Sequence, residues 1–362
     1  MGVIDSPVRL RHIECPNRVI RSATHDFLGT KDGHMTDAEY AMYEGFASSG
    51  VGLIITGHCC VMDGGLANRD QTRISDDSYI EQFRRLVDIV HSHGALIVPQ
   101  ISHAGPRAVD TDDFADASAG EVRRDRMARA LSKTEIEDIE KAFIAAAARL
   151  KKAGVDGVQL HAAHSYLLSR FIDPTFNHRE DEYGGSVENR FRIVEHIVCG
   201  IKETCGDDFP VLMKINSDTK ADDEAYAEDL KWIVKHSYDI GIELVEFSGV
   251  DFINLPRMDR LFYLERAAAM KRVVPKMPMS LVGGVRSLAE MEKVIESGLD
   301  MVSLSRALIA EPDFLKQVHR DTEHQSPCLS CNRCFVLPNM HPGVRCVREW
   351  KKIRDRRKAM NN

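Results

Sequence analysis

Two histidines and a tyrosine occur close enough together to act on one substrate. His161, His164 and Tyr166 lie in the segment QLHAAHSYLL, which includes the end of a short apolar run. Two imidazole N–H groups that converge on one oxygen can polarise a carbonyl or stabilise an enolate, and a tyrosine hydroxyl can supply a proton. We therefore treat these three side chains as candidate catalytic residues. A histidine metal site, for which no acidic third ligand is obvious, and a structural histidine pair stay open as alternatives.

A lysine and a glutamine interrupt two other apolar runs. Lys214 lies inside VLMKIN, and Gln100 lies inside ALIVPQIS. A lysine within a buried strand is rarely an ordinary core residue, because an unpaired buried charge is costly. An amide and a cation are the groups that hold the pyrimidine edge of a flavin, where reduction places negative charge. Both residues are therefore candidates for binding a flavin.

Adjacent glycines and an arginine near the end of the apolar pattern suggest a phosphate site. Gly283 and Gly284 occur in LVGGVRS, and Ser305 and Arg306 follow the last apolar run. Glycine N–H groups can approach phosphate oxygens closely, and a guanidinium donates two parallel hydrogen bonds to them. Many barrels bind phosphorylated ligands, so this signal alone does not identify the ligand. Arg306 could instead form a surface or inter-helix ion pair.

Eight short apolar runs carry these residues and alternate with amphipathic segments. Such continuous runs are typical of parallel strands that are buried on both faces. We predict a single (β/α)8 TIM barrel with its active site at the C-terminal strand ends. An open doubly wound sheet is the alternative, although no early GxGxxG supports it. The expected strands are 18–24, 53–58, 95–102, 158–162, 211–216, 242–248, 279–284 and 301–306.

Helices are expected between these strands. A glutamate three residues after Thr36 and another after Thr134 have capping-box spacing, which predicts two helix starts. Other helices are expected over 77–94, 186–205, 222–238, 259–273 and 287–298. The polar segment 105–130 has no clear period, and we interpret it as a lid or specificity loop. The barrel is expected to occupy residues 1–318, followed by a cysteine-rich extension over 319–362.

Four of the nine cysteines are clustered near the C-terminus. Clustered cysteines in a cytosolic chain indicate a metal more than disulfides. Two-residue spacings suit an iron–sulfur cluster, whereas four thiolates suit zinc equally well, and free redox thiols are the third alternative. The pattern C-x2-C-x2-C-x11-C is formed by Cys328, Cys331, Cys334 and Cys346.

Composition excludes several other classes of protein. The chain has 362 residues and a formal net charge of −7, so no global basic field favours nucleic acid. No apolar run approaches the roughly 20 residues that span a bilayer, and the N-terminus lacks the apolar core of a secretory signal. We expect a cytoplasmic protein that acts on small molecules, and we leave open whether it forms a homo-oligomer.

Several segments together resemble the old yellow enzyme family of FMN-dependent ene-reductases. The matching segments extend in family order from about Asn17 to Asp313. The block from His161 to Arg190, with HxxHxY followed by NxRxDxYGGSxxNR, is the most specific of them. HxxH resembles the bacterial branch that includes relatives of 2,4-dienoyl-CoA reductase and trimethylamine dehydrogenase. The segments are NRVIRSAT, VGLIITG, PQISHAG, GVDGVQLHAAHSYLLSRFIDPTFNHREDEYGGSVENR, LVGGVRS and SRALIAEPD.

This resemblance implies which residues bind the cofactor. Lys214 stands where many relatives have arginine, which keeps the charge but loses the planar fork. Gly283, Gly284, Ser305 and Arg306 are implied to hold the FMN phosphate. The residues implied to lie along the flavin are Ser22, Ala23, Thr24, His25, Gly57, Gln100 and Lys214.

The resemblance also implies an activity, the reduction by NAD(P)H of the activated C=C bond of an α,β-unsaturated carbonyl compound. His161 and His164 would bind the carbonyl, and Tyr166 would protonate Cα. The alternatives are an amine dehydrogenase or demethylase of the same fold, a flavin and iron–sulfur electron-transfer subunit, and a flavin-free barrel that binds a sugar phosphate. The natural substrate and the choice between NADH and NADPH stay open.

The cysteine segment resembles the [4Fe–4S] segment of the dienoyl-CoA reductase branch, with one departure. Those relatives have three residues between the second and third ligands, whereas two separate Cys331 and Cys334. The resemblance therefore implies a [4Fe–4S] cluster, with zinc as the alternative.

Overall fold

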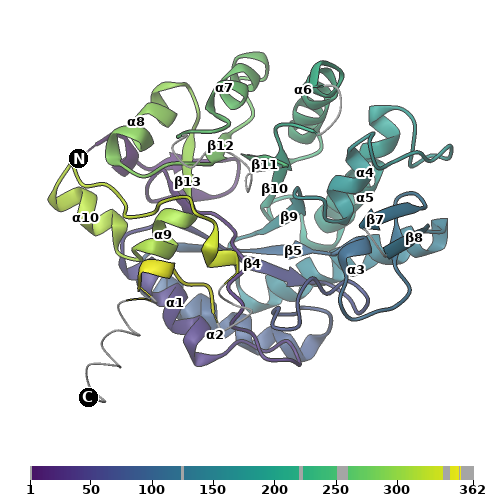
Figure 1. Ribbon diagram of the computed structural model, residues 1–362, viewed down its shortest axis with the longest axis horizontal. Helices are drawn as coiled ribbons and strands as arrows, with labels where there is room; N and C mark the ends of the chain where they lie inside the picture. Colours follow the sequence, from purple (N-terminus) through teal and green to yellow (C-terminus); the bar gives the residue numbers. More distant parts are fainter. Residues whose placement is uncertain are drawn as a thin grey trace.

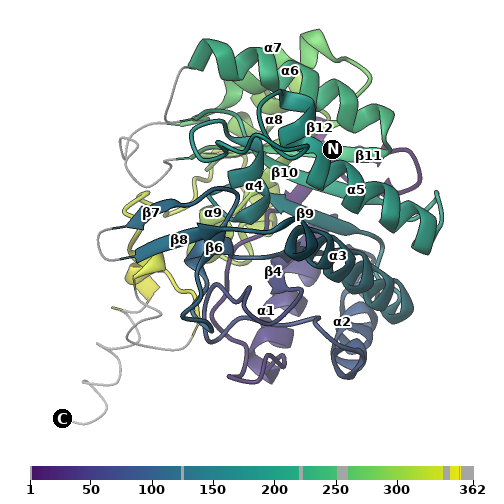
Figure 2. The ribbon, with the colours of Figure 1, turned by 90° about the vertical axis from the view of Figure 1, so that its right-hand side faces the viewer.

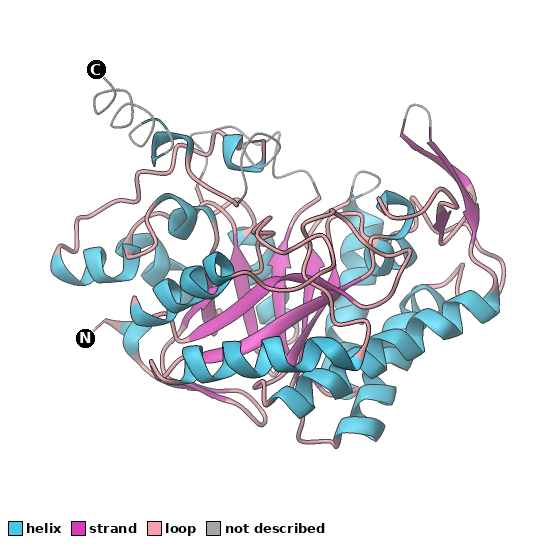
Figure 3. Ribbon diagram, turned by 90° about the horizontal axis from the view of Figure 1, so that it is seen from below, coloured by secondary structure: helices cyan, strands magenta, loops and turns pink. Residues whose placement is uncertain are grey.

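The structure, a computed structural model, describes residues 2–123, 126–219, 223–250, 260–336, 343–349 and 351. Eight parallel strands close into a barrel that helices surround (Figures 1 and 3). The predicted TIM barrel is confirmed, and the open sheet is excluded because the last strand pairs with the first. In spatial order the strands are β3 (Val19–Arg21), β4 (Leu53–Cys60), β5 (Leu96–Ser102), β9 (Val158–Ala162), β10 (Val211–Asn216), β11 (Ile242–Ser248), β12 (Met279–Val282) and β13 (Met301–Leu304).

Strand bounds follow the sequence closely where apolar runs end abruptly. Strands β9, β10 and β11 match their expected ranges. Strands β12 and β13 end two residues early, before Gly283 and Ser305. Gly284 has a φ of +75°, and Ser305 has a φ of −125° and a ψ of −85°, which is not an extended conformation. Neither segment therefore continues the hydrogen bonding between strands. Because the strands end early, the backbone N–H groups of these segments are available to the predicted phosphate site.

Two apolar layers hold the barrel together. The larger one packs the outer faces of the strands against the helices. The smaller one fills the barrel interior, where Leu53, Val98 and Leu244 meet Leu10 and Ile13 from the N-terminal hairpin. This hairpin pairs β1 (Val8–Arg9) with β2 (Glu14–Cys15) and follows the short helix η1 (Val3–Asp5). The hairpin packs against the interior, so the opposite end of the barrel is left for a site.

Helix starts are set by capping side chains. Thr36 accepts a hydrogen bond from the Glu39 N–H, as predicted. The third long helix begins two residues earlier than expected, because Ser132 and Glu135 form the capping box. The helices are η2 (Asp77–Tyr79), α1 (Asp37–Ser48), α2 (Ile80–His91), α3 (Lys133–Ala153), α4 (Leu167–Ile172), α5 (Val187–Cys205), α6 (Asp223–Asp239), α7 (Leu264–Val273), α8 (Leu288–Glu296), α9 (Arg306–Ala310) and α10 (Phe314–Arg320).

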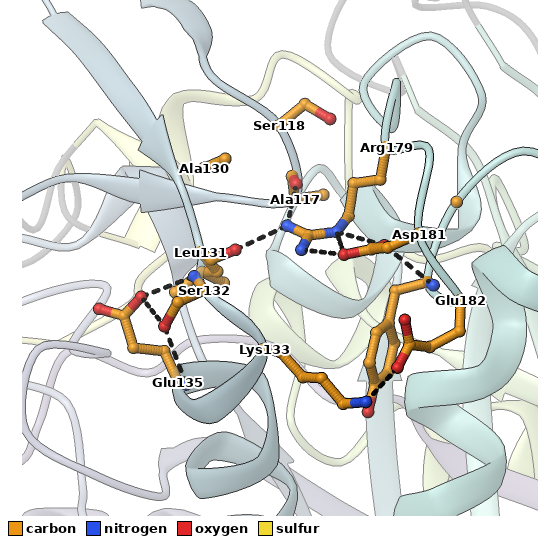
Figure 4. Close-up of polar contacts among 12 residues, drawn as sticks. Ala117, Ser118, Ala130, Leu131, Ser132, Lys133, Glu135, Arg179, Asp181 and Glu182 are labelled. Atoms are coloured by element: carbon orange, nitrogen blue, oxygen red, sulfur yellow. Dashed lines mark hydrogen bonds and ion pairs between the residues drawn. The ribbon is translucent and has the colours of Figure 1, made fainter.

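The polar segment after β5 forms a small sheet. It contains η3 (Gly105–Arg107), β6 (Ala115–Asp116), β7 (Gly120–Arg123) and β8 (Arg126–Ala130), and β7 and β8 project from the barrel (Figures 2 and 3). Its strands bury little, so no hydrophobic period revealed them. Anchors outside the sheet fix it instead. Asp116 pairs with buried Arg170, and Arg179 donates to the carbonyl oxygens of Ala117 and Leu131 at 2.9 and 2.7 Å (Figure 4).

The described part of the C-terminal extension packs on the barrel. Ser326 N–H donates to the carbonyl of Arg286 at 2.8 Å, and Val344 N–H donates to that of Asp26 at 2.7 Å. The short helix η4 (Arg333–Phe335) lies between these two contacts in sequence. Across the described residues, no helix combines the length and the apolar character needed to cross a membrane.

Candidate active site

A cavity of about 520 Å³ is lined by residues at or just after the C-terminal ends of all eight barrel strands. Its wall contains every predicted catalytic and flavin-binding residue except Gly57, and one of the four clustered cysteines. His58, Arg107 and Arg286 also line it, although no specific role was predicted for them from the sequence. The predicted residues that line the cavity are Ser22, Ala23, Thr24, His25, Gln100, His161, His164, Tyr166, Lys214, Gly283, Gly284, Ser305, Arg306 and Cys328.

Gly57 is the predicted flavin neighbour that lies elsewhere. It is not part of the cavity wall, and its N–H donates to the Tyr43 hydroxyl at 2.8 Å. A Cβ at this position would lie 2.6 Å from a carboxylate oxygen of Asp26. The glycine therefore allows β4 to pack closely against the Asp26 segment.

Lys214 is held by a buried carboxylate that the sequence analysis missed. Its Nζ lies 3.3 Å from Glu246 Oε2 and donates to Ser22 Oγ at 2.8 Å. Burial lowers the pKa of Lys214, and the nearby Glu246 carboxylate partly opposes this shift. Both side chains are almost completely buried, which only a paired charge tolerates. The signal for Glu246 was a glutamate inside the apolar run IELVEFS.

The same carboxylate orients Gln100 through a second glutamine. Gln159 Nε2 lies 2.9 Å from Glu246 Oε2, and Gln100 Nε2 lies 2.7 Å from Gln159 Oε1. An ionised carboxylate only accepts hydrogen bonds, so Gln159 must turn its NH2 group toward Glu246. Its carbonyl oxygen then receives the NH2 group of Gln100. The amide oxygen of Gln100 is therefore left for a ligand that donates a hydrogen bond.

His161 and His164 form a close pair of neutral imidazoles. Their ring centroids are 5.2 Å apart. Burial lowers the pKa of His164 to about 3 and that of His161 well below its ordinary value, with further lowering by neighbouring positive charge. His164 Nε2 contacts Ser248 Oγ at 2.8 Å. The buried Nδ1 of His161 has no hydrogen-bond partner among the described residues, which suits a group that binds a ligand.

The loop after β9 places this pair beside Tyr166. His164 and Ser165 both have positive φ, at 60° and 58°, which is unusual for residues other than glycine. Two such residues cost on the order of 1–3 kcal/mol each, and such strain is concentrated at functional sites. The Tyr166 ring lies 4.8 Å from that of His161, and burial raises the pKa of Tyr166. The tyrosine therefore keeps its proton at neutral pH.

The opposite wall carries the predicted phosphate residues. Gly284 has a φ of +75°, and a Cβ there would lie 2.7 Å from the Leu261 nitrogen, so only glycine fits. Arg306 donates to Asn332 Oδ1 at 2.7 Å, and no carboxylate within the described ranges pairs with it. Thr24 and Ser305 share a hydrogen bond of 2.8 Å between their hydroxyls. This wall offers glycine backbone and a cation, as a phosphate requires.

The sequence matches the family described as NADH:flavin oxidoreductase / NADH oxidase over residues 4–325. The chain belongs to this family. It is 32% identical to the NADH oxidase of Thermoanaerobacter brockii over 338 residues, covering 90% of this chain and 52% of that protein. It is also 32% identical to the N,N-dimethylglycine/sarcosine dehydrogenase of Chromohalobacter salexigens over 363 residues, covering 94% and 52%. The chain thus spans about half the length of these curated relatives.

A solved old yellow enzyme homologue from Zymomonas mobilis gives a structural comparison. It has a TM-score of 0.78 and 25% identity, and the match covers 90% of this chain and 94% of that one. The resemblance to old yellow enzymes is therefore confirmed. The closer resemblance to the dienoyl-CoA reductase branch stays a prediction.

The cavity of this NADH:flavin oxidoreductase family member fits a flavin nucleotide. Buried His25 Nε2 and His161 Nδ1 lack protein partners among the described residues, as expected where a ligand completes the wall. Gln100 offers an amide, and Lys214 a cation. Gly284 and Arg306 offer a phosphate cradle. Burial also lowers the pKa of His25 to about 3, so this histidine is neutral.

His58 is a further cavity residue, with a tautomer that its neighbour fixes. Gln71 Oε1 accepts from the Ala67 N–H at 2.7 Å, so Gln71 Nε2 is the NH2 group that lies 2.9 Å from His58 Nδ1. His58 Nδ1 must therefore accept, and Nε2 carries the proton of the neutral ring. Burial lowers the pKa of His58 well below its ordinary value. Its place at the end of the strand expected over 53–58 was the available signal.

The four clustered cysteines lie near one another beside the phosphate wall. Burial is the main cause that raises the pKa of Cys334 to about 12, and its neighbours Cys328, Cys331 and Cys346 contribute to that rise while Arg306 opposes it. Cys328 also lines the cavity. Within the described ranges, no three or more histidine, cysteine or acidic side chains are arranged to hold a metal ion. The structure therefore brings these thiols close together but does not arrange them as a set of metal ligands.

Proposed function

We propose that this chain is an FMN oxidoreductase that uses NAD(P)H to reduce the C=C bond of α,β-unsaturated carbonyl compounds. One observation carries the proposal. A neutral histidine pair and a protonated tyrosine share a cavity with a buried lysine, an oriented amide and a glycine–arginine cradle. The first group suits an activated carbonyl, and the second suits a flavin.

We assign residues in the flavin half of the cavity to the pyrimidine edge, the ring and the phosphate of FMN. Gln100 and Lys214 would hold the pyrimidine edge, and Ser22 to His25 would lie along the ring. Gly283, Gly284, Ser305 and Arg306 would hold the phosphate. When bound, FMN supplies the centre that carries a hydride from NAD(P)H to the second substrate. Glu246 would moderate the positive charge that Lys214 presents to that centre.

The histidine pair and Tyr166 would handle the oxygen and the proton. His161 and His164 would donate hydrogen bonds to the carbonyl oxygen, which gains negative charge as a hydride adds to Cβ. Because burial keeps both rings neutral, they would act as hydrogen-bond donors rather than as acids. Tyr166 would give its proton to Cα and regain one from solvent. In sum, NAD(P)H and one proton convert C=C to HC–CH, and NAD(P)+ leaves.

An anaerobic two-step titration tests this function. The purified protein, loaded with FMN, is first reduced with NADH or NADPH and then mixed with 2-cyclohexenone. We expect bleaching of the flavin absorption by the nucleotide and its return on addition of the enone, with one reduced product per nucleotide consumed. Bleaching without reoxidation by any enone would reject the proposed reductase.

An amine dehydrogenase is the second candidate, because one relative is an N,N-dimethylglycine/sarcosine dehydrogenase at 32% identity. Oxidation of an amine would bleach the flavin without any nucleotide. Adding dimethylglycine or trimethylamine to the oxidised protein therefore separates the two candidates. The described cavity wall carries no carboxylate that could attract an ammonium group, which favours the reductase.

We propose further that the clustered cysteines hold a [4Fe–4S] cluster, with zinc as the alternative. The motif C-x2-C-x2-C-x11-C and the proximity of the other thiols to buried Cys334 support a shared ligand set. About four irons and four sulfides per chain in anaerobically purified protein would support the cluster, and one zinc would support the alternative. An intact cluster with poor turnover of every small substrate would indicate an electron-transfer subunit. The ene reduction itself uses none of these thiols.

A further inference from the structure

The charged side chains among the described residues of the cavity wall are all positive. Among the described residues that line it, the charged ones are Arg107, Lys214, Arg286 and Arg306, and none carries a carboxylate. Three of these cations belong to the flavin half, either beside the pyrimidine contacts or in the phosphate wall. Arg107 is the cation left on the substrate side, next to His164 and Tyr166.

Arg107 contacts the catalytic loop directly. Its Nη1 donates to the carbonyl oxygen of His164 at 2.9 Å, and its guanidinium carbon lies 5.5 Å from the centre of the Tyr166 ring. That hydrogen bond uses one of the five N–H donors of the guanidinium. The side chain is exposed, and no carboxylate within the described ranges forms an ion pair with it. Most of its donors are therefore open to a ligand at the mouth of the cavity.

The backbone that carries Arg107 is fixed by a second arginine. Arg126 Nη1 donates to the carbonyl oxygens of Pro106 and Ala108, at 3.1 and 3.0 Å, which flank Arg107 on both sides. Arg179 anchors the same segment further along (Figure 4), and so does the Asp116–Arg170 ion pair. The backbone around Arg107 is therefore held in place, so less conformational entropy of the protein is lost when the guanidinium binds a ligand.

The positive charge of Arg107 also reaches the reacting groups. After burial, it is one of the charges that lower the pKa of His161 and His164, and it opposes the rise in the pKa of Tyr166. An anionic group bound at Arg107 would thus lie close to the histidine pair and Tyr166 rather than at a remote surface.

From this arrangement we infer that the substrate carries a carboxylate, which Arg107 binds while its carbonyl lies between His161 and His164. The inference rests on the proposed ene reduction and narrows it to anionic unsaturated carbonyl compounds. A guanidinium binds a carboxylate through two parallel charge-assisted hydrogen bonds. A hydrogen bond to a charged group contributes about 1.5–3 kcal/mol, which corresponds to roughly a 10- to 100-fold preference.

A matched pair of substrates tests this role. One is a cyclohexenone with a propanoate side chain, and the other is its methyl ester, in which the reactive enone is the same. We expect the wild-type protein to favour the carboxylate in kcat/KM by about 10- to 100-fold, mainly through KM. Arg107→Gln should remove this preference, and Arg107→Lys should retain part of it, because it keeps the charge but loses the fork.

Arg69→Gln is the matched control. Arg69 is an exposed arginine adjacent in sequence to cavity-lining Asn68, but it does not line the cavity itself. This variant should keep the carboxylate preference. Raising the salt concentration should weaken the preference of the wild type, because Arg107 is exposed to solvent.

A binding measurement separates failure of this inference from failure of the proposed function. Calorimetric titration with the saturated carboxylate and its ester should show tighter binding of the carboxylate to the wild type, and equal binding of both to Arg107→Gln. This readout holds even if neither enone is reduced, which would reject the reductase alone. Equal handling of carboxylate and ester by the wild type, or an unchanged preference in Arg107→Gln, would overturn the inference. It would also be overturned if Arg107→Gln lost only a preference for NADPH over NADH, because Arg107 would then bind the nucleotide phosphate.

Discussion

In the flavin half of the cavity, Lys214 and Gln100 lie within barrel strands and are held from behind by buried Glu246 and Gln159. In the substrate half, His164 and Tyr166 lie on the loop after β9, and Arg107 lies in the short helix η3. Hydrogen bonds from His164 to Ser248 and Asn216, and from Arg126 to the backbone around Arg107, hold these segments, and His164 has a positive φ. The residues of the flavin half are part of the buried barrel strands, so changes there should affect folding and cofactor binding together. The residues of the substrate half lie on segments outside the strands, so changes there should affect turnover and selectivity while the flavin stays bound.

Breaking the buried pair behind the flavin should have the largest effect. Glu246→Gln leaves the almost completely buried Lys214 without a counter-charge. Removing one partner of a buried ion pair costs about 3–5 kcal/mol, and we expect that decrease in the free energy of unfolding in urea. Removing both charges, with Lys214→Met and Glu246→Gln together, should restore most of the stability. The exposed pair Lys141–Asp138 is the control, because Asp138→Asn should cost less than about 1 kcal/mol.

The second effect should be confined to turnover. His164→Ala removes one donor to the developing oxyanion, which costs on the order of 10²–10³ in rate at comparable sites. We expect the variant to retain its FMN and to lose that factor in the reoxidation of reduced protein by an enone. His196→Ala, in a half-exposed histidine on α5 that pairs with Glu140, is the control and should behave as the wild type does. Unchanged turnover in His164→Ala would show that the histidine pair does not hold the substrate.

A smaller effect should follow from loosening the segment around Arg107. Arg126→Gln removes the donor to the Pro106 and Ala108 carbonyls and frees the turn that they flank. Hydrogen bonds of this kind contribute about 0.5–1.5 kcal/mol, so we expect the carboxylate preference to fall roughly three- to tenfold. The affinity for FMN should not change. A loss of FMN in Arg126→Gln would mean that the two halves of the cavity are not separable.

The smallest expected effect is a flat pH profile. The pKa of His164 is lowered to about 3 and that of His161 is well below its usual value, whereas that of Tyr166 is raised. The histidines would protonate only in strong acid and the tyrosine would ionise only in strong base. The rate of enone reduction by reduced protein should therefore not vary with pH between about 5.5 and 8.5. A fall in rate with a midpoint near the ordinary histidine pKa, as the pH is lowered, would contradict the neutral pair.

The flavin half could be predicted from the sequence because its residues interrupt apolar strands. Lys214 and Gln100 stood out for that reason, and the barrel determined which end they face. Glu246 and Gln159 carried the same signal, but their role depends on which strands are neighbours, β9 and β11 on either side of β10. The sequence alone could not distinguish Gly57 from the residues that line the cavity. Its close packing against Asp26 is visible only in the folded structure.

The substrate half was less predictable because its positions depend on loops. Arg107 is one charged residue among many in a segment without hydrophobic period, and its neighbours Arg126 and His164 are distant in sequence. The small sheet of β6, β7 and β8 was missed for the same reason, since its strands bury little. Nothing local in the sequence marks the contacts that fix this segment.

The most direct test of the account is the affinity for FMN of a matched pair of glycine variants. Gly284 and Gly64 have similar positive φ angles, 75° and 78°, but a Cβ would lie 2.7 Å from backbone at Gly284 and within 4 Å of nothing at Gly64. Flavin-free protein is titrated with FMN, and binding is measured by the quenching of flavin fluorescence. The wild type and Gly64→Ala should each bind one FMN per chain. Gly284→Ala should bind at least about tenfold more weakly, because the displaced backbone can no longer approach the phosphate. No binding by the wild type, or equal binding by both variants, would contradict the assignment of this cavity to FMN.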